Sequence, residues 1–319
     1  MRSFIIYGFI LNVFALLTFG WVRASNIKND VEARFPPIGQ FVNVENGRVH
    51  LVDIGDKTVT SKKTIVLLHG ATSNLRDMVS SIGTPLSDNF RVIAIDRPGH
   101  GWSSRNGAGD AQLALQAKIV AQVLEKLNVK EATFVGHSWA GALVMKLALD
   151  YPKLTRSIVL LSPVTHVWPG GIAWYHSLVT APIFGDIFTR EVAIQAAGFL
   201  MPKAIDAVFA PSLAPEGYIK QTGVELILRP DEFKANSQDL QILYDQVAAQ
   251  SPLYKYLVLP ALVITGDTDS VVSPEIHART VAKEMKSAEL VVLKGAGHAP
   301  QHSRTSEVVS RIKAFVDNQ

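Results

Sequence analysis

Ser138 lies in the segment of the sequence that is best suited to chemistry. Residues 136–141 are GHSWAG, preceded by an apolar run at 132–135 and followed by an apolar helical pattern at 143–149. At a sharp turn between a strand and a helix, a serine hydroxyl is exposed, and the helix N-terminus points backbone amides at the group it attacks. Small residues flank such a turn because the backbone leaves no room for larger ones. The pattern predicts that Ser138 is a nucleophile.

The segment departs at one position from the G-x-S-x-G pattern of such turns. Ala140 stands where the second glycine is usual, and Gly141 follows it directly. A glycine-rich turn that carries an incidental serine is the alternative interpretation, since short motifs also arise by chance. A catalytic serine needs a base, and the base needs an acid that orients it, so the rest of the chain must supply both.

Acidic residues and a histidine follow two predicted strands near the C-terminus. One strand ends in GDTD at 266–269, and a later strand ends in GAGH at 295–298. Ligands of open α/β sheets gather beyond the C-terminal ends of the strands. His298, between Gly297 and an alanine, is therefore the predicted base, and an aspartate of the GDTD segment is the predicted acid.

Four motifs in this order resemble those of the α/β-hydrolase fold, a family that includes esterases, lipases, carbon–carbon bond hydrolases and cofactor-free haloperoxidases. The resemblance covers residues 38–317. Each motif is weak alone, but the four together at this spacing are specific. They are LHGA at 68–71, DRPGHGWS at 96–103, the turn at Ser138, and the pair Asp269 and His298.

The resemblance implies a role for each motif. The family places the acid three residues after the glycine that ends the strand, which selects Asp269 and leaves Asp267 as a turn residue. The oxyanion hole is then formed by the backbone amides of Ala71 and Trp139. The segment 96–103 is expected to be mainly structural, bracing the edge of the sheet.

Two further histidines lie close to these motifs in the sequence. His137 precedes the nucleophile and is expected to pack against the site or orient it, rather than to act as the base. His302 follows His298 by four residues and is expected at the surface or at the rim of the site.

The implied reaction is a two-step acyl transfer. Ser138 attacks an ester-like carbonyl, His298 takes its proton, and Asp269 fixes the imidazole tautomer, after which water releases the acyl group. A serine at this position argues against haloalkane dehalogenases and epoxide hydrolases, which need a carboxylate nucleophile. Carbon–carbon bond hydrolysis and perhydrolysis by a haloperoxidase relative remain alternatives on the same triad. A non-catalytic binding protein of the same fold is a further alternative.

The elements that must position these residues alternate along the chain. An alternating pattern around Asn46 and Gly47 predicts a hairpin at 41–51. Alternation of strands and helices implies a mostly parallel, eight-stranded α/β-hydrolase sheet with helices on both faces. Its core comprises residues 38–162 and 254–317. Parallel strands are expected near 64–68, 91–96, 132–136, 158–162, 261–265 and 290–293, and helices near 113–127, 139–150, 274–286 and 304–316.

Between two of these strands, residues 163–253 form a predicted helical lid. The segment is rich in aromatic and aliphatic residues, with few charges before Glu216, and prolines divide it into short helices. Packing against the core accounts for most of these residues, and the surplus indicates an apolar pocket. A small, apolar, ester-like molecule is therefore the expected substrate.

The N-terminal segment, residues 1–25, differs in kind from the rest. Residues 4–22 are almost continuously apolar, which is long enough to span a bilayer. Residues 22–24 resemble the end of a cleavable signal peptide, although Arg23 makes that site imperfect. We therefore expect a protein that is membrane-anchored or exported, with a signal anchor favoured over a signal peptide.

Composition excludes several classes of function. The 319 residues carry a net charge of only +3, without a block rich in lysine and arginine, so no nucleic-acid partner is expected. The chain has no cysteine, which excludes disulfides, thiol catalysis and cysteine-bound metal. It has no metal-binding or nucleotide-binding motif either, so no cofactor and no metal is predicted.

Overall fold

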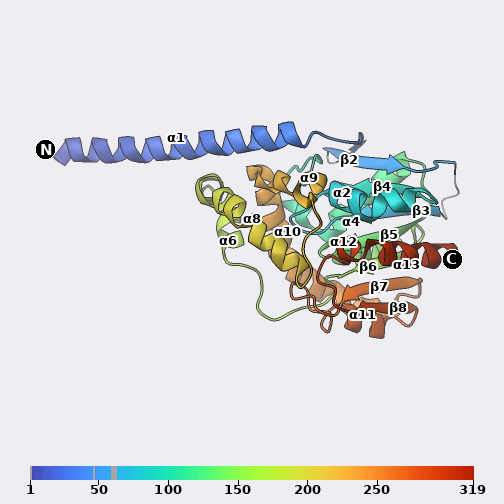
Figure 1. Cartoon of the computed structure of the whole chain (residues 1–319). Helices are drawn as coiled ribbons and strands as arrows, with labels where there is room; N and C mark the ends of the chain where they lie inside the picture. Colours follow the sequence, from blue (N-terminus) through green and yellow to red (C-terminus); the bar gives the residue numbers. More distant parts are fainter. Residues whose placement is uncertain (1, 46, 59–62) are drawn as a thin grey trace.

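One sheet of eight strands organises the part of the chain that the structure describes, residues 2–45, 47–58 and 63–319 (Figure 1). This computed structural model has the strand order β1-β2-β4-β3-β5-β6-β7-β8. β2 pairs antiparallel with β1 and β4, and every other pair is parallel. The predicted fold class is confirmed, while Asn46 of the predicted hairpin turn lies outside the described residues. The strands are β1 (Gln40–Val44), β2 (Gly47–Ile54), β3 (Thr64–Leu68), β4 (Arg91–Ile95), β5 (Ala132–His137), β6 (Thr155–Leu161), β7 (Ala261–Gly266) and β8 (Ala288–Leu293).

The central strands are apolar throughout because both faces of the sheet are covered. Successive side chains of a strand point to opposite faces. In β3, Val66 and Leu68 belong to one hydrophobic cluster, whereas Ile65 and Leu67 belong to another on the opposite face. A strand buried on both sides needs apolar residues at every position, which explains the unbroken TIVLL sequence of β3.

Helices cover the two faces of the sheet separately. The first cluster takes in α4 (Leu113–Lys126), α5 (Ala140–Asp150) and α11 (Ala278–Glu284). The second takes in α2 (Leu75–Met78), η2 (Val79–Gly83), α3 (Thr84–Ser87) and α13 (Thr305–Asp317). Two short helices, η3 (Ala108–Ala111) and α12 (Pro300–Ser303), lie in connections. The helix predicted at 274–286 is shorter than expected, since turns occupy 274–277.

A helical insert, residues 162–260, connects β6 to β7 and contributes no strand, although the structure describes all of it. Its longest helix, α10, packs Leu243 and Val247 into the first cluster and so fixes the insert to the core. The insert comprises α6 (Tyr175–Thr180), α7 (Phe184–Phe188), η4 (Thr189–Ala193), α8 (Ile194–Phe209), α9 (Tyr218–Thr222), η5 (Val224–Leu228), α10 (Pro230–Gln250) and η6 (Ser251–Tyr256).

The chain begins with a long helix, α1 (Arg2–Arg34), which continues past the predicted N-terminal segment. Ala24 of α1 is buried in a cluster with residues of the insert, and Val31 packs with Phe35 and Leu226 in a smaller one. The part of α1 before these contacts projects away from the body of the protein (Figure 1). The last third of the helix is therefore part of the folded domain.

Candidate active site

Ser138 occupies the turn between β5 and α5 and has a backbone conformation that side-chain-bearing residues rarely adopt. Its φ is 55°, and such strain persists only where the surroundings hold it. Its amide donates to the carbonyl of Leu161 at 2.9 Å, and its own carbonyl accepts from Gly141 and Val164, each at 2.9 Å. The turn is thereby fixed to the end of β6 and to the start of the insert.

Close backbone packing explains the small residues around the serine. A Cβ at position 136 would lie 2.6 Å from the carbonyl oxygen of Ala140. A Cβ at position 141 would lie 2.5 Å from Cβ of Pro163. Ala140 itself is fully buried and fits. Glycine is required on both sides of the serine, and the second required glycine is Gly141 rather than residue 140.

The serine, the histidine and one aspartate form a continuous hydrogen-bonded chain. His298 Nε2 lies 2.9 Å from Ser138 Oγ, and His298 Nδ1 lies 2.8 Å from Asp269 Oδ2. The other oxygen of Asp269 accepts the amides of Val271 and Val272 at 2.9 Å. Burial raises the pKa of Asp269, but the hydrogen bond and charge of His298 and the two amides outweigh it, so that pKa is lowered overall. Asp269 is therefore an ionised acceptor.

The loop after β3 brings a backbone amide close to the serine. A Cβ at Gly70 would lie 3.1 Å from Cβ of Ser138, so this loop and the turn are in close contact. Within the described part of the chain, no hydrogen bond occupies the amide of Ala71 or that of Trp139. Backbone amides without a hydrogen-bond partner are the kind of donor that can stabilise a developing oxyanion.

Arg97 contacts both the loop that carries Ala71 and the side chain of Trp139. Its fully buried guanidinium donates to the carbonyls of His69 and Gly70, each at 3.1 Å, and lies 3.9 Å from the ring centroid of Trp139. Asp239 of α10 pairs with the same guanidinium. The arginine therefore fixes the loop that carries one donor and packs on the side chain of the residue that carries the other.

The sequence is also similar to a known protein family. A family model described as the alpha/beta hydrolase fold matches residues 63–305, about three quarters of the chain. The chain belongs to this family.

Two curated relatives of this hydrolase differ in the reactions their names give. A 2-hydroxy-6-oxononadienedioate/2-hydroxy-6-oxononatrienedioate hydrolase of a Pseudomonas species is 26% identical over 80% of this chain and 87% of its own. Lipase 3 of a Moraxella species (strain TA144) is 25% identical over 82% of each chain. Among solved structures, a membrane phospholipase A described as a bacterial virulence factor superposes with a TM-score of 0.66 and 20% identity, covering 100% of this chain and 99% of its own. This superposition shows a shared fold.

His137 of the hydrolase lies against the site without joining the chain of side chains. Its Nε2 is 2.9 Å from the carbonyl oxygen of His298, and the two rings are 5.0 Å apart. Burial and the neighbouring His298 lower the pKa of His137 to about 4. A neutral His137 with its proton on Nε2 donates to that carbonyl and so orients the backbone of His298.

His302, which was expected at the surface or at the rim of the site, is partly buried. Its side chain is 7% exposed and its Nε2 lies 2.8 Å from Oδ1 of Asp77 on α2. A buried carboxylate needs a charged or hydrogen-bonding partner, and His302 supplies one. Burial raises the pKa of Asp77, but the charge and hydrogen bond of His302 outweigh it and bring that pKa to about 2.

The insert supplies residues that the sequence did not single out. Asn236 of α10 accepts the amide of Thr72 at 2.7 Å, next to Ala71, and Asp239 holds Arg97. The amide of His298 donates to the carbonyl of Val208, at the end of α8, at 3.1 Å. The two α10 residues lie on a helix with many polar residues, and the Val208 contact uses only backbone, so no local pattern marks any of them.

Aspartates outside the triad are engaged in structure. Asp267 accepts the amide of Gly295 at 2.7 Å and so joins the two loops that carry the acid and the histidine. Asp96 accepts the amides of Leu75 and Trp102, at 2.7 and 2.8 Å, which braces the edge of the sheet. Among the described residues, no group of three histidines and carboxylates is arranged to hold a metal ion.

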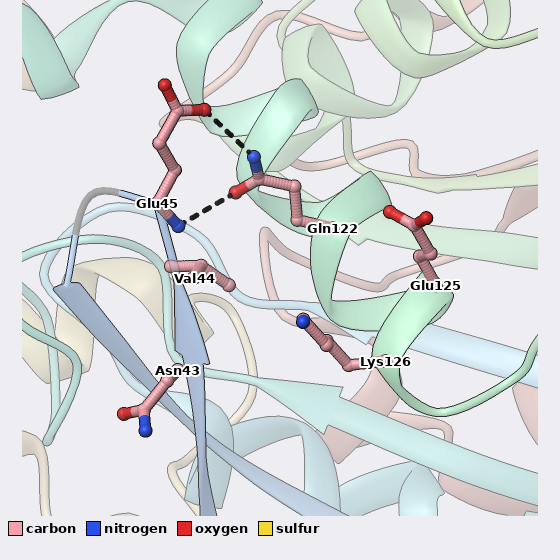
Figure 2. A pocket seen from close by; sticks show the side chains of 6 residues that line it. All are labelled: Asn43, Val44, Glu45, Gln122, Glu125 and Lys126. Atoms are coloured by element: carbon pink, nitrogen blue, oxygen red, sulfur yellow. Dashed lines mark hydrogen bonds between the residues drawn. The ribbon is translucent and has the colours of Figure 1, made fainter.

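A surface hollow of about 380 Å³ lies away from these residues, between the end of β1 and α4 (Figure 2). Glu45 and Gln122 face each other across it, linked by two hydrogen bonds that Figure 2 marks. Its lining is mostly polar and charged, and it contains none of the site residues, so it has no part in the chemistry of the site.

Proposed function

We propose that this protein is a serine hydrolase that cleaves an ester-like bond of a small, apolar substrate. The observation that carries the proposal is the chain of contacts from Ser138 Oγ through His298 to Asp269, at 2.9 and 2.8 Å. These three side chains come from the ends of different strands, and a nucleophile, a base and an acid in this geometry have one common use.

In the proposed mechanism, the proton of the serine hydroxyl moves to His298 Nε2 as Ser138 Oγ forms a bond to the carbonyl carbon. The amides of Ala71 and Trp139 donate to the oxygen that becomes negative. The tetrahedral intermediate then collapses, the bond to the leaving oxygen breaks, and His298 gives that oxygen its proton. Water then attacks the acyl carbon as His298 takes a proton from it. The bond between that carbon and Ser138 Oγ breaks, His298 returns the proton to Oγ, and the carboxylic acid leaves. Asp269 holds His298 Nδ1–H throughout.

The surroundings of the site support an apolar substrate. Ser138 is only 9% exposed beneath a helical insert rich in aliphatic and aromatic side chains. We propose that residues 163–253 of this insert act as the lid, with residues 38–162 and 254–317 as the catalytic core. The lipase relative favours acyl esters as the substrate class.

We further propose that α1 anchors the enzyme in a membrane. Residues 4–22 are almost continuously apolar, and the large apolar side chains of Leu11 and Phe14 in this stretch are 70% and 68% exposed. A helix of this length whose described large apolar side chains are mostly exposed is stable where lipid surrounds it.

The carbon–carbon bond hydrolase relative favours a second candidate function on the same residues. Parallel assays of p-nitrophenyl acyl esters of graded chain length and of a 2-hydroxy-6-oxo-dienoate distinguish the two. Turnover of the dienoate with none of the esters would replace the ester assignment by the carbon–carbon one.

Replacement of the nucleophile tests the mechanism. Ser138→Ala should abolish both ester turnover and covalent labelling by a fluorophosphonate, since the probe bonds to Oγ. Ser162→Ala is the matched control, because Ser162 is also buried, also at a strand end and also has a positive φ. Labelling that survives in Ser138→Ala but not in Ser162→Ala would overturn the assignment.

A further inference from the structure

The insert exposes an apolar surface that its packing against the core does not explain. The surface runs from the connection between α6 and α7 to the middle of α8, residues 181–200, and we call it the insert tip. Its two most exposed apolar residues, Ile183 and Phe199, are 88% and 86% exposed. Phe184, Val192 and Leu200 of the same surface are also exposed. Several large apolar side chains exposed along one short segment indicate an interaction surface.

Ile183 is held in this position by a strained backbone. Its φ is 62° and its ψ is −58°, a conformation that β-branched residues almost never adopt. The backbone of Gly185, two residues further on, is held in place. Its amide donates to the carbonyl of Ala181 at 2.9 Å, and a Cβ there would lie 2.2 Å from the carbonyl oxygen of Val179. The fold therefore maintains strain in order to present an apolar side chain to the outside.

The helix α1 leaves the domain beside this surface. The guanidinium of Arg190 lies over the side chain of Trp21 of α1, 4.2 Å from the centroid of the tryptophan ring. The carboxylate of Glu191 lies against Gly20. Arg190 and Glu191 belong to η4, within the insert tip. From this contact α1 extends outward on the same side of the molecule as α6 and α8 (Figure 1). The insert tip and the outward-projecting part of α1 therefore meet at this contact.

The helical segment 184–209, which overlaps the insert tip, meets the length and composition of a membrane span without being one. Residues 184–209 are long and apolar enough to cross a bilayer, and 22% of the apolar window is buried. However, Phe209 at its end is 1% exposed, and Val208 is hydrogen-bonded to the amide of His298. A segment whose end is fixed inside the enzyme lies along an apolar phase instead of crossing it.

We propose that the insert tip is a second membrane contact, which lies in the interface of the lipid bilayer beside α1. The bilayer is the occupant that fits, because α1 carries its own exposed apolar side chains outward from the edge of the same surface. Ile183 and Phe184 enter the boundary between headgroups and acyl chains, and the helical insert over Ser138 faces the lipid. The contact fixes the orientation of the enzyme on the membrane, whichever ester it hydrolyses.

The absence of cysteine from the chain allows a direct test with single labels. Ile183→Cys reports on the insert tip, and Val258→Cys is the matched control. Both residues are β-branched and 88% exposed, but Val258 precedes β7, at the edge of the sheet opposite to the site. Each full-length variant carries a polarity-sensitive fluorophore and is reconstituted into phosphatidylcholine vesicles, with brominated lipid or aqueous iodide as the quencher.

The proposal expects brominated lipid to quench the label at 183 several-fold more than the label at 258, and iodide to show the reverse order. Phe199→Cys provides a second position in case the strained turn at 183 does not tolerate the label. Equal quenching by iodide at all three positions would overturn the proposal, as would failure of the protein to bind vesicles. A label at 183 that is shielded without lipid would indicate a second protein copy instead. The inference rests on the proposed anchoring by α1 but not on hydrolysis. Failure to bind vesicles would overturn the anchor as well, whereas equal iodide quenching in vesicle-bound protein would overturn the contact of the insert tip alone.

Discussion

Two carboxylates two residues apart after β7 have different partners, and the partners separate their roles. Asp269 faces His298, whereas Asp267 holds the backbone of the neighbouring loop through Gly295. In both contacts a carboxylate oxygen is the hydrogen-bond acceptor. A change from carboxylate to amide therefore affects them differently.

We expect Asp269→Asn to lower ester turnover on the order of 10⁴-fold, because the amide favours the wrong tautomer of His298. Asp267→Asn should have little effect, since the amide oxygen of asparagine can still accept from Gly295. Comparison of kcat for the two variants, with folding checked by circular dichroism, measures the difference. A larger loss in the Asp267 variant would show that Asp267, and not Asp269, is the acid.

The segments that carry these residues were predictable from sequence because each depends on local signals, whereas the choice of Asp269 over Asp267 came from the family resemblance. The serine turn, the GDTD segment and the GAGH segment follow apolar strands, and parallel strands bring their ends to one edge. Asp239 was not predictable in this way. Its contact with Arg97 joins residues 142 positions apart, and such a pairing depends on how the insert docks, which periodicity alone does not specify.

At the scale of elements, a buried contact between a carboxylate and a histidine joins two short helices. Asp77 of α2 and His302 of α12 meet at 2.8 Å, and both side chains are almost fully buried. Tyr218 of α9 also donates to Asp77 at 3.2 Å. Three short helices, from the core and from the insert, are therefore held by one carboxylate.

The Asp77 pair should make stability depend on acid pH. The pKa of Asp77 is lowered from 3.8 to about 2 in the folded protein, so its contribution is present above the unfolded pKa and is lost as pH falls through the folded one. The difference in unfolding free energy between wild type and Asp77→Asn should be about 2 kcal/mol at about pH 5 and roughly half that at about pH 3. Urea denaturation at both pH values measures it. A difference that does not shrink would refute the ionised pair.

Strand positions agreed with their prediction more closely than short helices did. A strand such as β3 has one apolar run and one register. The helix expected at 274–286 lost its first turn, where the amide of Thr165 approaches His277 Nδ1 at 3.2 Å and the Thr165 hydroxyl donates to the His277 carbonyl at 3.1 Å. Contacts from another part of the chain decide such ends, and local propensity does not include them.

At the scale of the whole molecule, α1 belongs partly to the enzyme and partly to its surroundings. Its last turns pack Ala24 and Val31 against the insert, while the earlier turns project from the body (Figure 1). A cut after Ala24 would remove the contacts that Gly20 and Trp21 make with η4.

We therefore expect native protein to retain residues 1–24 and to sediment with membranes, because about 20 apolar residues are stable in a bilayer and not in water. Intact-mass measurement of protein from its native host, together with membrane fractionation, tests both parts. A mature N-terminus at Ser25 would show that the segment is a cleaved signal peptide.

The bond from the amide of His298 to the carbonyl of Val208 has a consequence for enzyme engineering. The insert is not an interchangeable cap, because its helix α8 ends by positioning the backbone of the histidine. A chimera that takes its insert from a relative also takes that relative's last turn of α8, and with it the setting of His298. Substrate preference and turnover rate should therefore change together in such chimeras, unless the grafted segment keeps the geometry of residue 208.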